Sequence, residues 1–220
     1  DKVMWKENIL TPTKVTTLSD IAAIGCGAYG SFAISGSSQV YAWGLNQYGQ
    51  LGIEAEGDSA AEGDTAFFAP KAVPSLSGQR IQKIFGGEHH TFALTEVGQL
   101  LSFGRPTYGR LGRQDVNPKK DARHWKPAAV HGFEGVTVVH AAAAGQVSGA
   151  VTADGRAFAW GSGGDAMLGK PEGDEEDEHL PRGIVGLKGV LAIGFGGQHA
   201  ALLVSSEAAT GGAPSNKRQR

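Results

Sequence analysis

The sequence predicts an all-β protein, an open arc of a β-propeller made of four-stranded blades. One observation is a frame of small residues that opens at Gly27, Gly87, Ala144 and Gly197, at intervals of 60, 57 and 53 residues. Another is that each copy contains two short segments in which large and small residues alternate, as in half-buried strands. Such an interval is too long for a two-helix repeat and suits a blade of four short strands.

The spacing inside the first three copies is regular. A glycine that follows an aromatic residue lies 17 residues after the opening position, and a second glycine lies 8 residues beyond it. These glycines are Gly44 and Gly52 in the first copy, Gly104 and Gly112 in the second, and Gly161 and Gly169 in the third. Spaced glycines indicate tight turns and close backbone approaches in a sheet protein, whereas a flexible linker would not be periodic.

Each of the first three copies is expected to contain one hairpin of defined register, whereas the fourth fades after Val204. The predicted strand pairs are 31–35 with 39–43, 91–95 with 99–103, and 149–152 with 156–160, with turns near 36–38, 96–98 and 153–155. Pro12 and Val15 precede Gly27 much as Pro70 and Val73 precede Gly87. We therefore expect the chain to begin in mid-repeat, with the last two strands of a blade whose first two are missing.

The two faces of each hairpin differ in bulk. One face carries Trp43, Phe103 and Trp160, and the opposite face carries Ala42, Ser102 and Ala159. A large face against a small face allows neighbouring blades to pack closely. Hydroxyl residues recur four positions after the opening residue, and we expect them to satisfy buried backbone groups in each inner strand. They are Ser31, Thr91 and Ser148.

Composition limits the classes of function. The formal net charge of −2 excludes a polybasic nucleic-acid binder, so electrostatic function must come from local patches. The single cysteine, Cys26, excludes an internal disulfide and a cysteine-built zinc site, and no apolar run approaches the length of a membrane span. We expect a protein of the cytosol or nucleus without a membrane partner.

Three long polar connections carry local charge. Segments 53–69 and 170–180 are acidic, whereas 105–126 holds seven basic and two acidic residues, a net of +5. Each is either solvated loop surface or a partner-binding patch.

The expected domain organisation is a partial propeller over 1–204, with copies opening near 25, 85, 142 and 195, and a disordered tail over 205–220. The tail ends in Lys217-Arg218-Gln219-Arg220, which is either a nuclear-import signal or merely a basic end.

One repeat position is a candidate binding site. The residues two after the opening position are Tyr29, His89, Gln146 and His199, all able to form hydrogen bonds. At the start of an innermost strand they should gather on one rim of the central channel, where several blades can present side chains to one partner. The alternative is that each histidine only caps its own blade.

No catalytic constellation, cofactor site or metal site is predicted. The glycine-rich turns lack the lysine and the strand-to-helix context of a phosphate loop. His89 and His90 would point to opposite faces of a strand, and segment 172–178 lacks the ligand spacing of a calcium loop.

Three motifs carry a family resemblance. Gly86-Gly87-Glu88-His89-His90-Thr91, Tyr108-Gly109-Arg110-Leu111-Gly112 and Gly196-Gly197-Gln198-His199 resemble the regulator of chromosome condensation family. That resemblance implies a seven-bladed propeller of which this chain supplies about 3.5 blades. It also implies guanine-nucleotide exchange on the small GTPase Ran, which one face grips while the other binds chromatin, that is DNA and histones, in the nucleus.

The resemblance further implies that His89 and His199 contact the GTPase, with Tyr29 and Gln146 as weaker candidates, and Glu88 replaces the family's usual glutamine. We place the basic segment 105–126 on the DNA side. The rival function is an interaction propeller of the same superfamily, a scaffold, sensor or ubiquitin-ligase accessory without exchange activity. Neither is a bond-making enzyme. A half-ring expressed alone should be poorly soluble or oligomeric, because its end blades lack cover.

Overall fold

A computed structural model describes residues 11–54, 66–164 and 166–206 of the chain. Most of the first acidic connection and the basic end of the chain, Lys217 to Arg220, lie outside the described residues.

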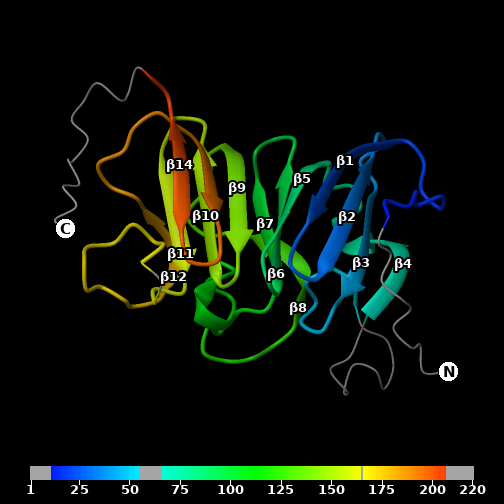
Figure 1. Cartoon of the computed structure of the whole chain (residues 1–220), viewed down its shortest axis with the longest axis horizontal. Helices are drawn as coiled ribbons and strands as arrows, with labels where there is room; N and C mark the ends of the chain where they lie inside the picture. The colour runs from blue at the N-terminus through cyan, green and yellow to red at the C-terminus, as the bar shows by residue number, and fades with distance from the viewer. Residues whose placement is uncertain (1–10, 55–65, 165, 207–220) are drawn as a thin grey trace.

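The described residues form three four-stranded antiparallel sheets and one two-stranded sheet (Figure 1). Each four-stranded sheet is a blade whose strands pair in chain order, and the two-stranded sheet begins a fourth blade. The strands are β1 (Ile21–Cys26), β2 (Gly30–Ser35), β3 (Val40–Leu45) and β4 (Ala66–Ala72) in blade 1; β5 (Ile81–Gly86), β6 (His90–Thr95), β7 (Leu100–Gly104) and β8 (His124–Ala129) in blade 2; β9 (Val138–Ala144), β10 (Val147–Thr152), β11 (Ala157–Gly161) and β12 (Glu178–Gly183) in blade 3; and β13 (Val190–Phe195) and β14 (Ala200–Val204) in blade 4.

The predicted hairpins and their register are confirmed. Ser31 pairs with Trp43, Thr91 with Phe103 and Ser148 with Trp160. The helices of the described residues are two short 3₁₀ turns, η2 (Pro74–Leu76) and η3 (Thr107–Gly109), and no described helix has the length and apolar character to cross a bilayer.

Apolar side chains of neighbouring blades interlock as the two-faced pattern predicts. Phe103 of blade 2 is fully buried and belongs to a cluster with Phe32 and Ala42 of blade 1. Trp160 of blade 3 is likewise fully buried, in a cluster with Phe92 of blade 2. Trp43 of the first blade, whose large face has no described blade before it, stays partly exposed. The bulky face of each blade therefore covers the small face of the preceding one.

The innermost strands are β1, β5, β9 and β13. Each contacts the next in that series, whereas β4, β8 and β12 make no comparable contact with a strand of another blade. The innermost strands of neighbouring blades lie close together. A Cβ on Gly25 of β1 would lie 2.6 Å from the carbonyl oxygen of Ile84 in β5.

The prediction that the strand just before Gly27 ends an earlier blade is wrong. Residues 11–20 form no strand, and β1 is the first strand of a complete blade rather than the last strand of an earlier one. The same shift by one strand applies to every copy, since the strand before each opening residue pairs with the hairpin that follows it.

Candidate partner-binding rim

The four opening residues begin tight turns that join the two inner strands of each blade. The turns span 27–30, 87–90, 144–147 and 196–199. We call this edge of the arc the turn rim; it is the lower edge in Figure 1, with the hairpins 36–38, 96–98 and 153–155 at the upper edge. Adjacent turns are bonded, because Ala28 N donates to Gly87 O at 3.0 Å and Glu88 N donates to Gly145 O at 3.3 Å. The turns thus form one continuous surface.

The candidate residues lie in these turns rather than at the start of an innermost strand, because the innermost strand ends just before each turn. Tyr29, His89 and Gln146 occupy the third turn position, as the predicted equivalence requires.

The predicted alignment of the fourth copy is wrong by one residue. Gly196 N donates to His199 O at 2.8 Å, just as Gly87 N donates to His90 O at 2.8 Å. His199 is therefore the counterpart of His90, and Gln198 occupies the third position. The Gly196-Gly197 pair caused the error, because either glycine fits the frame and only the strand pairing distinguishes them.

Side-chain packing supports this register. A Cβ on Gly87 would lie 2.2 Å from Cε1 of His90, and a Cβ on Gly196 would lie 2.1 Å from Cε1 of His199. A histidine at the fourth position folds over the first and requires glycine there. The third turn has Val147 at its fourth position, which explains why Ala144 is accommodated.

His90 links two blades. Its Nε2 lies 2.8 Å from Ser148 Oγ, which donates to Arg110 O at 2.9 Å. Because the hydroxyl proton of Ser148 is committed to Arg110 O, Nε2 of His90 carries the proton that it donates to Oγ. Burial, and then the nearby Arg110 guanidinium, hold the pKa of His90 well below its ordinary value, so the ring is neutral.

The hydroxyl positions reach across blades. Thr91 Oγ1 donates to Gln50 O at 2.7 Å, and Ser148 repeats this contact one blade further on. They satisfy buried backbone carbonyls, as predicted, but the carbonyls belong to the preceding blade.

Aromatic side chains meet at the rim between blades 1 and 2. The Tyr29 and His89 rings stack with centroids 5.3 Å apart, and the Tyr48 ring meets His89 edge-on at 4.9 Å. The Arg105 guanidinium lies 4.5 Å from the centre of the Tyr48 ring. Tyr29 is 49% exposed, so this group presents an amphipathic surface to solvent.

Tyr48 and Arg105 were missed as candidates. A signal for Tyr48 was present in the sequence, because Tyr48 and Tyr108 occupy the same position of the turn that follows the third strand.

Repeated backbone contacts hold the third turn residues rigidly. Leu45 N donates to Tyr29 O at 2.8 Å, Arg105 N to His89 O at 2.8 Å, and Ser162 N to Gln146 O at 3.1 Å. The glycine before each donor has a positive φ, and a Cβ there would lie within 2.2–2.4 Å of the same carbonyl oxygen. The close approach explains the glycine 17 residues into each copy: Gly44, Gly104 and Gly161.

Charged groups surround His89. Burial lowers its pKa below the ordinary value, although Glu88, whose Oε1 lies 3.8 Å from Nε2, opposes the shift. The Arg110 side chain is fully buried, and burial together with Arg105 lowers its pKa to about 10. Both residues retain a buried nitrogen without a hydrogen-bond partner among the described residues, Nδ1 of His89 and Nη1 of Arg110.

A shallow depression continues the rim toward blade 4. It has a volume of about 260 Å³ and is lined by Glu88, Gln146, Ser162, Gly197 and neighbouring residues. Residues of three blades thus line one concave surface, with polar side chains from blades 2 and 3.

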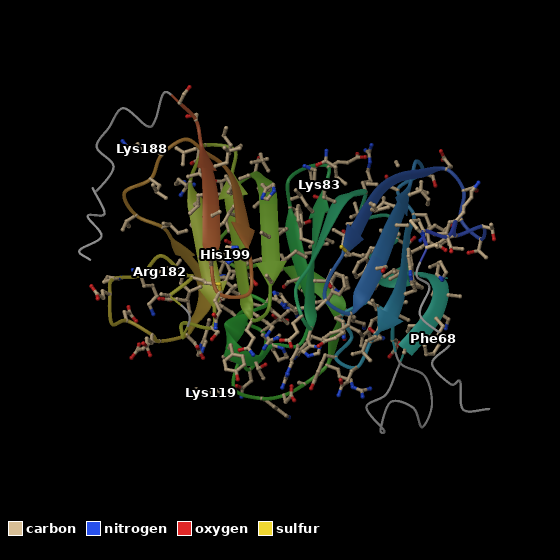
Figure 2. All side chains as sticks on the ribbon, viewed as in Figure 1. Phe68, Lys83, Lys119, Arg182, Lys188 and His199 are labelled. Atoms are coloured by element: carbon tan, nitrogen blue, oxygen red, sulfur yellow. The ribbon has the colours of Figure 1, made fainter. Side chains whose placement is uncertain are left out.

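The basic segment 105–126 lies on the turn rim, not on the opposite edge where we placed it. It begins at Arg105, which is bonded to His89 O, and Lys119 lies at the lower edge in Figure 2. The acidic connection that follows Ser162 lies on the same edge (Figure 1). Within the ranges described, no group of three or more His, Cys, Asp or Glu side chains could hold a metal ion.

Repeated four-stranded blades, with glycines at the close backbone approaches of each turn, define an arc of a β-propeller. The chain belongs to the RCC1-like domain family, which matches residues 2–202.

Three comparisons illustrate the range of relatives. The human regulator of chromosome condensation is 36% identical over 188 residues, 83% of this chain and 41% of the relative. The probable E3 ubiquitin-protein ligase HERC4 of Rattus norvegicus is 31% identical over 205 residues, 91% of this chain and 18% of the relative. The crystal structure of Prp20p from Saccharomyces cerevisiae matches this fold with a TM-score of 0.71 and 27% sequence identity, over 88% of this chain and 46% of that one. The chain thus spans less than half the length of these relatives.

Proposed function

We propose that this chain is the partner-binding arc of a guanine-nucleotide exchange factor for a Ran-like small GTPase, and that the turn rim contacts the GTPase. The observation that carries the proposal is the convergence of Tyr29, His89 and Gln146 from three blades on one edge. Their backbone carbonyls each accept a hydrogen bond from an amide at or just after the end of the third strand of the same blade. The stacked rings of Tyr29 and His89 join blades 1 and 2. A rigid scaffold that presents variable side chains to solvent is typical of a binding surface.

Relatives support the choice of partner. The Prp20p structure was reported with the binding properties of that protein to Gsp1p and histones. The match to the human regulator of chromosome condensation covers most of this chain. On this basis we assign the protein to the nucleus, with chromatin, through histones and DNA phosphate, as its second partner on the hairpin edge.

Exchange requires binding energy rather than bond-making chemistry. An exchange factor that binds the nucleotide-free GTPase more tightly than the loaded form lowers the affinity of the GTPase for nucleotide. Bound nucleotide lowers the affinity of the GTPase for the exchange factor by the same ratio. The rim residues are therefore binding residues, and no catalytic residue or cofactor is assigned.

The corrected register separates the two histidines. We assign His89 to the GTPase contact, together with Tyr29, Gln146 and Gln198. His90, the counterpart of His199, is buried and bonded to the following blade. We therefore propose that His199 makes the same contact with the next blade in the longer protein, and acts on the GTPase only by positioning the turn.

A second candidate is an interaction propeller without exchange activity, located outside the nucleus as well as within it. The similarity to HERC4 favours it, because that match covers 91% of this chain.

Release of a fluorescent guanine nucleotide from a Ran-like GTPase distinguishes the candidates. The longer protein that contains this arc should accelerate release, and His89→Ala should reduce the acceleration by roughly tenfold or more, as expected for a buried contact residue. Arg80→Ala is the control, because the exposed Arg80 side chain pairs with Glu96 of the hairpin at 96–98 on the other edge. No acceleration by the wild-type protein would favour the interaction propeller, and an unaffected His89→Ala variant would reject the assignment of the rim.

A further inference from the structure

Two charged loops lie on the turn rim. Each is held in a folded conformation by hydrogen bonds, and each exposes side chains of one sign of charge. The basic loop is 117–120 and the acidic loop is 172–177. They extend from adjacent blades, 2 and 3.

The basic loop is fixed by local hydrogen bonds. Asn117 accepts bonds from both lysine amides, at 2.9 Å from Lys119 N to Oδ1 and at 3.2 Å from Lys120 N to the carbonyl oxygen. Tyr108 N donates to Pro118 O at 3.1 Å, which attaches the loop to η3. Both lysine side chains are exposed, and neither has an ion-pair partner within the described ranges.

The nearby carboxylates do not neutralise these lysines. Asp121 is held by Arg105, with Oδ1 2.7 Å from Nε and Oδ2 3.0 Å from Nη2. Asp115 is held by Arg113, whose hydrogen bond lowers the pKa of Asp115. Positive charge is therefore left uncompensated at the tip of the loop.

The acidic loop is folded around one lysine. Lys170 Nζ donates to Glu176 O at 2.6 Å and pairs with Asp174, and only 3% of its side chain is exposed. Gly163 N donates to Asp177 Oδ1 at 3.1 Å, which fastens the loop to the rim. The side chains of Glu172, Glu175 and Glu176 remain exposed and form no ion pair among the residues described.

The supports of the two loops are in direct contact. A Cβ on Gly109, in η3, would lie 2.2 Å from Cα of His179, at the start of β12. The backbone segments that support the two loops are therefore held together, and both loops lie on the same edge as the turns 87–90 and 144–147 (Figure 1).

We propose that the turn rim orients its partner through this charge pair. The partner is a protein whose surface carries an acidic patch over the basic loop and a basic patch over the acidic loop. This inference rests on the proposed function, since it takes the GTPase as the partner. A uniformly negative ligand such as DNA would be attracted by one loop and repelled by the other, whereas a bipolar surface gains from both and docks in one rotational setting about the propeller axis.

The test is the association rate of the longer protein with the nucleotide-free GTPase, measured by stopped flow at several salt concentrations. The variants are Lys119→Glu with Lys120→Glu, and Glu175→Lys with Glu176→Lys. Each should slow association by about tenfold at low salt, because steering charges act mainly on this rate. The difference should shrink as salt rises, because the lysines and glutamates are exposed.

The control pair is Lys83→Glu with Lys188→Glu, two exposed lysines at the opposite edge in Figure 2, which match the charge change. This control should leave the association rate within twofold of wild type.

Four outcomes overturn the inference. One is an association rate unchanged by either loop reversal, which leaves the proposed function standing if His89→Ala still impairs exchange. Another is an equal effect of the control pair. A third is loss of binding to a 30-base-pair DNA duplex, but not to the GTPase, on reversal of the basic loop. The fourth is absence of GTPase binding by the wild-type protein, which rejects the proposed function as well.

Discussion

Ser148→Ala tests the hydrogen-bonded contact that joins blades 2 and 3. The substitution removes the acceptor of His90 Nε2–H and one of two donors to Arg110 O. Trp160 Nε1, at 3.0 Å, still donates to that carbonyl, so the larger cost falls on His90. Its ring is 1% exposed, and its Nδ1 already lacks a partner among the described residues.

The magnitude follows from these contacts. An unsatisfied buried donor costs about 1–3 kcal/mol and a lost hydrogen bond about 1 kcal/mol, so Ser148→Ala should destabilise by about 2–4 kcal/mol. Thr91→Ala removes a single bond to Gln50 O and should cost about 1–2 kcal/mol. Ser148→Thr keeps the hydroxyl, as at Thr91, and should cost less than Ser148→Ala.

Urea unfolding of the longer protein measures these differences, provided that the slope with denaturant is unchanged. A double-mutant cycle with His90→Val isolates the coupling between His90 and Ser148, which should be at least about 1 kcal/mol. A coupling near zero, or a Ser148→Ala cost no greater than that of Thr91→Ala, would refute the contact.

Two further predictions concern the same turn. Because the pKa of His90 in the folded protein lies well below its ordinary value of 6.5, the unfolded chain binds more protons below that pH. Stability should therefore be constant above about pH 6.5 and fall as the pH drops below it, and His90→Val should weaken this dependence in urea unfolding across pH 5–8. Gly87→Ala should cost about 1–3 kcal/mol, because its Cβ would collide with the His90 ring. Adding His90→Val, which recreates the Ala144–Val147 pair of the third turn, should recover part of that loss, and Gly194→Ala, with open space around its Cβ, serves as the control. An unaltered pH profile in His90→Val, or a Gly87→Ala cost that His90→Val does not relieve, would contradict the packing.

Glycine spacing was sufficient to predict the blades and hairpins, because Gly44, Gly104 and Gly161 mark positions where a Cβ would meet backbone. It could not assign strands to blades. The repeat period is identical whether β1 ends one blade or begins the next, and only the pairing of β1 with β2 decides between them.

Part of the arrangement of the site could be predicted from the sequence. The edge that carries segment 105–126 follows from the direction of the strands, since the third strand of an antiparallel blade returns to the edge of the first turn. The contact of His90 with Ser148 joins residues 58 positions apart, and the sequence supplies no signal for it. The identity of His199 depended on one residue of register, which Gly196-Gly197 leaves ambiguous.

Hydrogen–deuterium exchange of the longer protein, alone and bound to nucleotide-free GTPase, tests the central claim most directly, because amides covered by a partner gain protection. The account predicts added protection in the turns 27–30, 87–90 and 144–147, with the hairpins 36–38, 96–98 and 153–155 unchanged. Protection confined to the hairpins, with the turns exchanging as in the free protein, would contradict it.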